Sequence, residues 1–494
     1  MNPSRKLQTN SRDTAPLKLV HSANRNSKNN PALTDRQTRW SLVGASAILS
    51  LGFLATAPGF LDLGAFYSGS VHFALWATLV LTWSAFASLY KGELKLGFRS
   101  HYATPFYFAL GLTCFLFYSV GTGNRLTVES AYWTDVSQSL HYSYNMGNAR
   151  GPALYPFLAS ILHSLFGFKE QHMFWVNFLA CALLFTLMIR TGERLTKNRW
   201  YGIVSVFFLA SFPIFGVMAT GNGPELWNAL LVAAVCYQIY RFVQEPGLVR
   251  MEFAAALTLL AAQCQPASLF FLVPIATLAY QHRERLLAET PDLKTVALPV
   301  LTIPVASLIL ANGWLGNNLN VAYFLDNVHS IGDFMLNRGS NFPISSQVFT
   351  LAAAAGLALL ASQWQRVTKS HHVPLRASAY FLAGLGLVTL ATFAYEPRDL
   401  ARFADARVMM VYLPLLALAA TYPLYRLYEK GVGASVIGLL VVANFCYQLP
   451  NQTRTVAFNI EGKTPQVVSR RPAHVAPPIG GSRVARARSV VQYR

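Results

Sequence analysis

Apolar blocks of roughly 18–20 residues recur along the chain, and each is followed by a basic cluster. A helix of that length is long enough to cross the hydrocarbon core of a bilayer. The pattern therefore predicts an all-α polytopic membrane protein with about thirteen transmembrane helices. We expect spans at residues 41–60, 72–90, 104–121, 172–190, 200–218, 224–243, 294–314, 347–365, 375–394, 407–426 and 433–449, with two short spans within 251–281.

The composition agrees with a membrane protein. The chain is 53% hydrophobic and 12% charged, about half the charged fraction of a soluble protein. Its formal net charge of +19 would suggest nucleic acid in a soluble protein. Here Lys and Arg are typical of cytoplasmic loops and of contacts with anionic headgroups, and no aromatic-basic module is visible. We expect membrane lipids, and no nucleic acid, among its partners. The five cysteines lack paired metal spacing and are interpreted as buried thiols.

Loop charges set the predicted topology. Residues 1–39 are expected to form a disordered basic cytoplasmic tail, residues 40–450 the transmembrane domain, and residues 451–494 a second disordered basic tail. Both tails are candidate docking arms for protein partners. We expect a multi-pass protein of a bacterial inner membrane, with the N-terminus in the cytoplasm. The opposite side then receives the C-terminal tail and residues 129–171, 220–225, 317–347 and 396–407.

The longest hydrophilic interval in the membrane part, residues 129–171, predicts two short amphipathic helices on the membrane surface. In the first, Tyr132, Val136 and Leu140 recur at fourfold spacing. The second follows the Gly151-Pro152 break. Both are too short to span a bilayer.

The apolar block 251–281 contains Gln263-Cys-Gln-Pro266. Proline removes a helix hydrogen bond, so we expect the helix to break at Gln265-Pro266. The flanking Gln side chains are expected to satisfy the freed backbone groups.

Three carboxylates at the outer ends of predicted spans are candidate site residues. Glu129 opens the first amphipathic helix and is the candidate catalytic base, with Asp135 and Glu225 as supporting residues. In a helix, the spacing of six would put Glu129 and Asp135 about 120° apart, so a tight pair is not expected. The alternative for Glu129 and Glu225 is a favourable charge at a helix N-terminus.

Arginines at the outer end of a span contradict the positive-inside rule. Arg402 and Arg407 are therefore candidate phosphate-binding residues, because guanidinium binds phosphate bidentately. The alternative is simple pairing with Asp399 and Asp405. The spacing of Asp326 and His329 is a weak metal signal. No cofactor is certain, and a divalent metal stays open.

The interval that begins "ESAYW" and continues "GPALYPFLASILHSLFG" resembles the first loop of the GT-C membrane glycosyltransferases, most of all the branch of protein O-mannosyltransferases and lipid A aminoarabinose transferases. "AALTLLAAQCQPASLFFLVPIATL" and "RFADARVMMVYLPLLALAA" are similar to two later family segments. The family's leading Asp falls on Glu129, its following Glu on Ser130, and a Lys near Gln265.

The resemblance implies an inverting transfer of a sugar from a polyprenyl-phosphate carrier to an acceptor at the outer face of the membrane. It implies Glu129 as base and Arg402 and Arg407 as phosphate partners. The departures at Ser130 and Gln265 leave open a catalytically inactive scaffold subunit of a larger complex. A lipid flippase or transporter would instead predict charges within spans and internal symmetry, whereas the charges here cluster in loops.

Overall fold

The structure is a computed structural model of the chain. It describes residues 103–121, 128–143, 154–289, 320–336, 345–362, 373–394, 398, 400 and 403–461, together with Thr82 and Phe86. The predicted spans 41–60, 72–90 (apart from those two residues) and 294–314 lie outside the described residues. So do the whole N-terminal tail and the C-terminal tail after residue 461.

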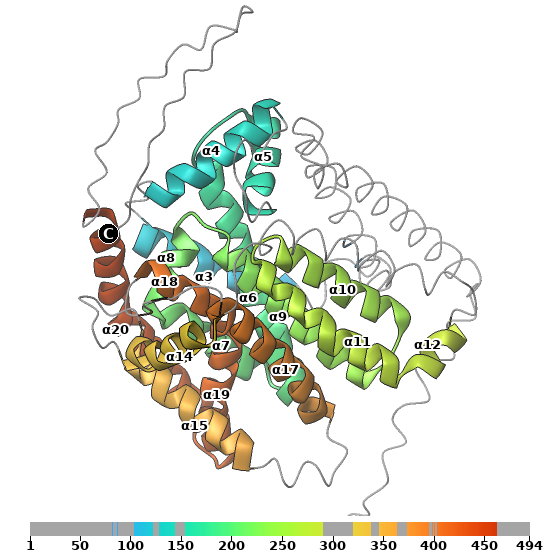
Figure 1. The fold of residues 1–494 in the computed structure, drawn as a ribbon. Coiled ribbons are helices and arrows are strands. Elements are labelled where there is room, and N and C mark those ends of the chain that lie inside the picture. Colours follow the sequence, from blue (N-terminus) through green and yellow to red (C-terminus); the bar gives the residue numbers. More distant parts are fainter. Residues whose placement is uncertain are drawn as a thin grey trace, which may run out of the picture.

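The described part of the chain is entirely helical (Figure 1). Its elements are α3 (Ala103–Gly121), α4 (Val128–Ser143), α5 (Leu154–Phe166), α6 (His172–Thr196), α7 (Arg199–Ser211), α8 (Pro213–Thr220), α9 (Glu225–Gln244), α10 (Leu248–Ala262), η2 (Pro266–Phe271), α11 (Leu272–Gln281), α12 (Arg283–Glu289), α14 (Val321–Leu336), α15 (Gln347–Ser362), α17 (Val373–Phe393), α18 (Phe403–Ala406), η3 (Arg407–Val411), α19 (Leu413–Glu429) and α20 (Ala434–Glu461). The predicted C-terminal tail thus begins as a continuation of α20.

Three helices of the described part are long and apolar enough to cross a membrane, namely α6, α9 and the first twenty residues of α20. A fourth candidate is the pair α7 and α8, which bends by 83° between Ser211 and Pro213. The total of thirteen spans stays a prediction.

The predicted span over residues 200–218 is broken in the structure, because Pro213 starts a new helix. The bend leaves the carbonyl oxygen of Ala210 without a helical partner, whereas that of Phe212 still accepts from the Gly216 backbone N–H. The buried Gln452 side chain of α20 donates hydrogen bonds to the carbonyl oxygens of Ala210 and Phe212. An apolar environment requires such a substitute partner.

The predicted break before Pro266 is confirmed. Helix α10 ends at Ala262, and η2 and α11 return alongside it (Figure 1). The role expected for Gln265 is wrong, since its side chain binds other side chains instead of the freed backbone. Its amide oxygen accepts from Asn228 on α9 at 2.6 Å, and its amide nitrogen donates to Thr392 on α17 at 3.1 Å.

Small residues allow the central helices to approach closely. A Cβ at Gly202 of α7 would lie 2.5 Å from the backbone of Ile189 on α6, and one at Gly356 of α15 would lie 1.8 Å from the carbonyl oxygen of Ala419 on α19. Packing between helices is the main attraction within a membrane, where apolar side chains gain little by leaving lipid. These two close approaches therefore join α6 to α7 and α15 to α19.

The charged residues were expected to cluster in loops, but one of them lies within an apolar block. Glu252 lies on α10, within the apolar block 251–281, and is 4% exposed. Its Oε2 atom has no hydrogen-bond partner. A buried acid in such a helix is expensive, so this position departs from the predicted pattern.

Gly202→Val should destabilise the protein by more than about 1–3 kcal/mol, because the obstacle is rigid backbone rather than a mobile side chain. Thermal unfolding in detergent measures the loss. Gly386→Val on α17 is the matched control, since nothing lies within 4 Å of a Cβ built there. Equal melting temperatures for the two variants would contradict this packing.

Candidate active site

Polar segments that are remote in sequence meet at one end of the bundle. The first backbone N–H of α5, at Leu154, donates to the carbonyl oxygen of Gln263 in the break after α10, at 3.3 Å. The Tyr155 hydroxyl donates to Asn222 Oδ1 at 2.6 Å, in the loop between α8 and α9. Helices α4 and α5 thereby sit over the start of α9 and the turn of the α10–α11 hairpin (Figure 1).

Glu225 and Arg407 form an ion pair at this end, with 3.3 Å between Oε1 and Nη1. Their side chains are 19% and 22% exposed. Glu225 is the first residue of α9, where the helix dipole favours a carboxylate, and Arg407 is the first residue of η3. Arg407 pairs with Glu225, a partner that the sequence did not predict, and Asp399 lies outside the described residues.

The Glu225 carboxylate lies against the backbone of Gly223. A Cβ there would lie 2.3 Å from Oε2 of Glu225. The carboxylate therefore rests directly on the backbone of the loop that leads into α9. Its position is fixed from one side by this loop and from the other by Arg407.

Tyr155 and Asn222 belong to this site although the sequence analysis did not single them out. Tyr155 is completely buried. Burial, and next the charge of Glu225, raise the pKa of Tyr155 well above its ordinary value. The hydroxyl therefore stays protonated and neutral. In the sequence, Tyr155 is the tyrosine of "GPALYPF", a segment that supported only the family resemblance.

The candidate base is only partly placed. Glu129 lies in the first turn of α4, but its side chain is outside the described residues. Asp135 is exposed on the same helix. Of the three residues at fourfold spacing, Val136 and Leu140 are buried, whereas Tyr132 is exposed. The described atoms do not bring Asp135 into contact with Glu225 or Arg407. Arg402 lies outside the described residues.

The position that resembles a family Lys carries a neutral amide in a polar network. Gln265 binds Asn228 and Thr392, and Ser268 donates to Asn228 Oδ1 at 2.9 Å. Asn228 lies one turn after Glu225 on α9. Gln265 therefore stabilises the turn of the hairpin next to the ion pair and brings no charge to it.

An apolar groove of about 870 Å³ lies between α3, α5, α6 and the start of α9. Trp227, two residues after Glu225, forms part of its wall, and its Nε1 donates to the carbonyl oxygen of Val176 at 3.2 Å. Two groove residues on α6, Trp175 and Leu179, are about half exposed. The groove thus opens at the outer surface of α6. Its wall consists of Phe117, Leu158, Ile161, Leu162, Gln171, Phe174, Trp175, Val176, Phe178, Leu179 and Trp227.

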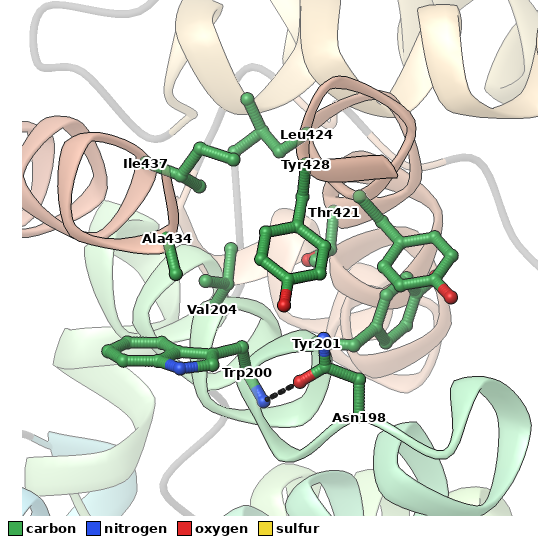
Figure 2. A pocket seen from close by; sticks show the side chains of 10 residues that line it. Asn198, Trp200, Tyr201, Val204, Thr421, Leu424, Tyr428, Ala434 and Ile437 are labelled. Atoms are coloured by element: carbon green, nitrogen blue, oxygen red, sulfur yellow. Dashed lines mark hydrogen bonds between the residues drawn. The ribbon is translucent and has the colours of Figure 1, made fainter. Parts of the chain in front are cut away.

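A second pocket, at the far end of α7 and α19, is a structural feature rather than a candidate site. Figure 2 shows Trp200, Tyr201 and Tyr428 around it, with Asn198 capping α7 through the Trp200 backbone N–H at 2.9 Å. Its volume of about 20 Å³ is close to that of one water-sized sphere. The pocket therefore has no room for a substrate.

The structure does not support a metal site at Asp326 and His329. Asp326 and His329 are both exposed on α14. Within the described ranges, no group of three or more His, Cys, Asp or Glu side chains could hold a metal ion.

Comparisons with known proteins bear on this end of the chain. Residues 150–309 match the family model described as dolichyl-phosphate-mannose-protein mannosyltransferase. No curated protein matches the chain. Among solved structures, ArnT from Cupriavidus metallidurans bound to undecaprenyl phosphate is similar at 16% identity and a TM-score of 0.45, over 68% of this chain and 62% of that one. The arabinosyltransferase EmbB from Mycobacterium smegmatis is similar at 11% identity and a TM-score of 0.37, over 80% of this chain and 45% of that one.

This chain thus spans 62% of the length of ArnT. The matched residues 150–309 include α5, the Asn222 loop, Glu225 and the hairpin turn at Gln265. The predicted resemblance to polyprenyl-phosphate-sugar-dependent membrane glycosyltransferases is therefore confirmed for the segment that builds most of the candidate site.

Proposed function

We propose that the protein is an inverting glycosyltransferase that moves a sugar from a polyprenyl phosphate to an acceptor hydroxyl at the outer face of a membrane. The observation that carries the proposal is the Glu225–Arg407 ion pair, which lies where three polar segments meet, while an apolar groove reaches Trp227 on the same helix, α9. A lipid-linked sugar needs both surroundings at once: cationic groups for its phosphate and an apolar surface for its prenyl chain.

The reaction assigns a role to each end of the site. The acceptor oxygen attacks the anomeric carbon from the face opposite the phosphate, and its proton passes to the Glu129 carboxylate. The bond between the anomeric carbon and the phosphate oxygen breaks, and the polyprenyl phosphate leaves with the electron pair. Configuration at the anomeric carbon inverts. Asp135, exposed on the same helix as Glu129, would support the acceptor side.

Arg407 and Arg402 would stabilise the departing phosphate. Glu225 orients the Arg407 guanidinium, with 3.3 Å between Oε1 and Nη1, and a guanidinium binds phosphate through parallel N–H donors. The prenyl chain would lie in the groove beside Trp227, entering from the exposed face of α6. The volume of the groove is in the range of ligand pockets.

Glu129→Gln should lower transfer by about 10²–10⁴-fold, because it removes the base and keeps the shape of the side chain. The measurement is transfer from a polyprenyl-phosphate sugar by the purified protein. Glu170→Gln, at an exposed carboxylate after α5, is the control and should stay near wild type. Near-wild-type transfer by Glu129→Gln would show that Glu129 only places a favourable charge at the helix N-terminus. If the unmutated protein transfers no sugar from any lipid-linked donor, the catalytically inactive scaffold subunit is favoured instead.

A double-mutant cycle tests whether Arg407 binds substrate or only neutralises Glu225. Arg407→Gln removes charged hydrogen bonds worth about 1.5–3 kcal/mol each, so kcat/KM should fall about 10- to 100-fold. If Arg407 contacts the phosphate, the pair Glu225→Gln/Arg407→Gln should stay as impaired as Arg407→Gln alone. Recovery of kcat/KM in the double variant would mean that Arg407 serves Glu225 alone.

A further inference from the structure

One buried asparagine on α6 binds the loop that leads into the candidate site. The Asn177 side chain is completely buried. Its amide nitrogen donates to the carbonyl oxygens of Gly221 and Gly223, at 3.1 and 3.2 Å. Both glycines belong to the loop of residues 221–224, which lies between α8 and α9 and ends directly before Glu225. Asn177 therefore joins α6 to the backbone against which the Glu225 carboxylate lies.

This amide uses both of its donors on the loop and leaves its acceptor unused. An amide nitrogen carries two hydrogens, and Asn177 has one loop carbonyl for each. The flipped amide would place its oxygen against two carbonyl oxygens, so the hydrogen bonds settle the orientation. The Asn177 Oδ1 atom is buried and has no hydrogen-bond partner. A buried acceptor without a donor costs free energy, so the side chain serves the loop rather than the stability of α6.

Helix α6 also binds two other segments of the site. His163 of α5 is hydrogen-bonded to His172 of α6, with 2.8 Å between the Nδ1 atoms. Trp227 of α9 donates to the carbonyl oxygen of Val176, the residue that precedes Asn177. Val176 and Trp227 both line the apolar groove. Two consecutive residues of α6 thus fix the groove wall and the loop before α9 relative to each other.

The contacts continue from this loop to the arginine of the ion pair. Oε2 of Glu225 lies against Gly223, and Oε1 lies 3.3 Å from Nη1 of Arg407. Glycine has more backbone freedom than any other residue, so a loop with glycines at positions 221 and 223 depends on such outside contacts for its shape. A shift of Gly223 would move the Glu225 carboxylate and, with it, the guanidinium that this carboxylate orients.

We propose that Asn177 is a positioning residue, which sets where the Arg407 guanidinium lies relative to the apolar groove. A lipid phosphate whose chain occupies the groove reaches Arg407 only if the groove wall and the ion pair keep a fixed separation. The effect on sugar transfer rests on the proposed function, whereas the attachment of the loop to α6 rests on the contacts alone. Asn177 itself contacts neither donor nor acceptor.

Hydrogen exchange tests the attachment of the loop without any need for turnover. Asn177→Leu removes both donors at nearly constant volume. Amide protection of residues 221–231 is measured by mass spectrometry on the full chain in detergent. The variant should lose about 10- to 30-fold in protection there, as expected for two net hydrogen bonds. Unchanged protection of residues 221–231 would overturn the proposal.

Ser205→Ala is the matched control for hydrogen exchange and for transfer. Ser205 is completely buried on α7 and is hydrogen-bonded to Thr421 of α19 at 2.9 Å. The control therefore also loses a buried hydrogen bond between two helices, but neither helix carries the loop or Glu225. Protection of residues 221–231 and kcat/KM should both change less than about 3-fold. A loss equal to that of Asn177→Leu would mean that general loosening of the bundle is being measured.

A double-mutant cycle tests whether Asn177 acts through Arg407. Asn177→Leu alone should lower kcat/KM for a polyprenyl-phosphate sugar by about 10- to 100-fold, because the phosphate partner is misplaced. In the Arg407→Gln background the same substitution should cost less than about 3-fold, because no guanidinium is left to misplace. Equal losses in the two backgrounds would mean that Asn177 supports the fold in general, and would overturn the positioning role.

Asn177→Ser provides the same test if Asn177→Leu does not fold. A serine hydroxyl has one hydrogen and can donate to one of the two carbonyls at most, so protection of the loop should still fall, and the loss of kcat/KM should again depend on Arg407. Absence of transfer by the unmutated protein would overturn the proposed function together with the positioning role. Normal transfer by an Asn177 variant whose loop has lost protection would overturn the positioning role alone.

Discussion

The need to satisfy backbone groups at helix breaks organises this structure. Helices interrupted in an apolar environment leave carbonyl and amide groups that water cannot serve. At the 83° bend before Pro213, Gln452 of α20 supplies the donors. At the turn before Pro266, the carbonyl of Gln263 accepts from the first amide of α5. Each break is therefore also an attachment point for a segment that is remote in sequence.

These attachments place the candidate site. Because α5 is tied to the turn after α10 and to the loop before α9, the Tyr155 hydroxyl and the Glu225 carboxylate are brought near each other. Arg407, at the start of η3, completes the arrangement through its ion pair with Glu225. The helix break within the apolar block 251–281 thus attaches α5 to the end of the bundle where Glu225 and Arg407 lie.

Local signals in the sequence predicted the local features. Fourfold spacing predicted that Val136 and Leu140 are buried, and Pro266 predicted the hairpin turn. The same rule applied to Pro213 would have predicted the bend in residues 200–218, which apolarity alone concealed. Glu225 and Arg407 could be proposed singly from their places at span ends, but their contact joins residues 182 positions apart and depends on packing. The His163–His172 bond likewise has no signal in either helix, because it depends on how α5 folds back on α6.

The central claim is that a polyprenyl phosphate binds with its phosphate at Arg407 and its chain in the groove along α6. Photo-crosslinking tests it most directly, with a benzophenone amino acid replacing the exposed Trp175 in the groove or the exposed Leu439 on α20. We predict that labelled polyprenyl phosphate crosslinks at position 175 and that excess unlabelled polyprenyl phosphate abolishes this crosslink. Arg407→Gln should weaken the crosslink at position 175. Position 439 should give only background that the unlabelled lipid does not reduce. Equal, non-competed crosslinking at both positions would contradict the account.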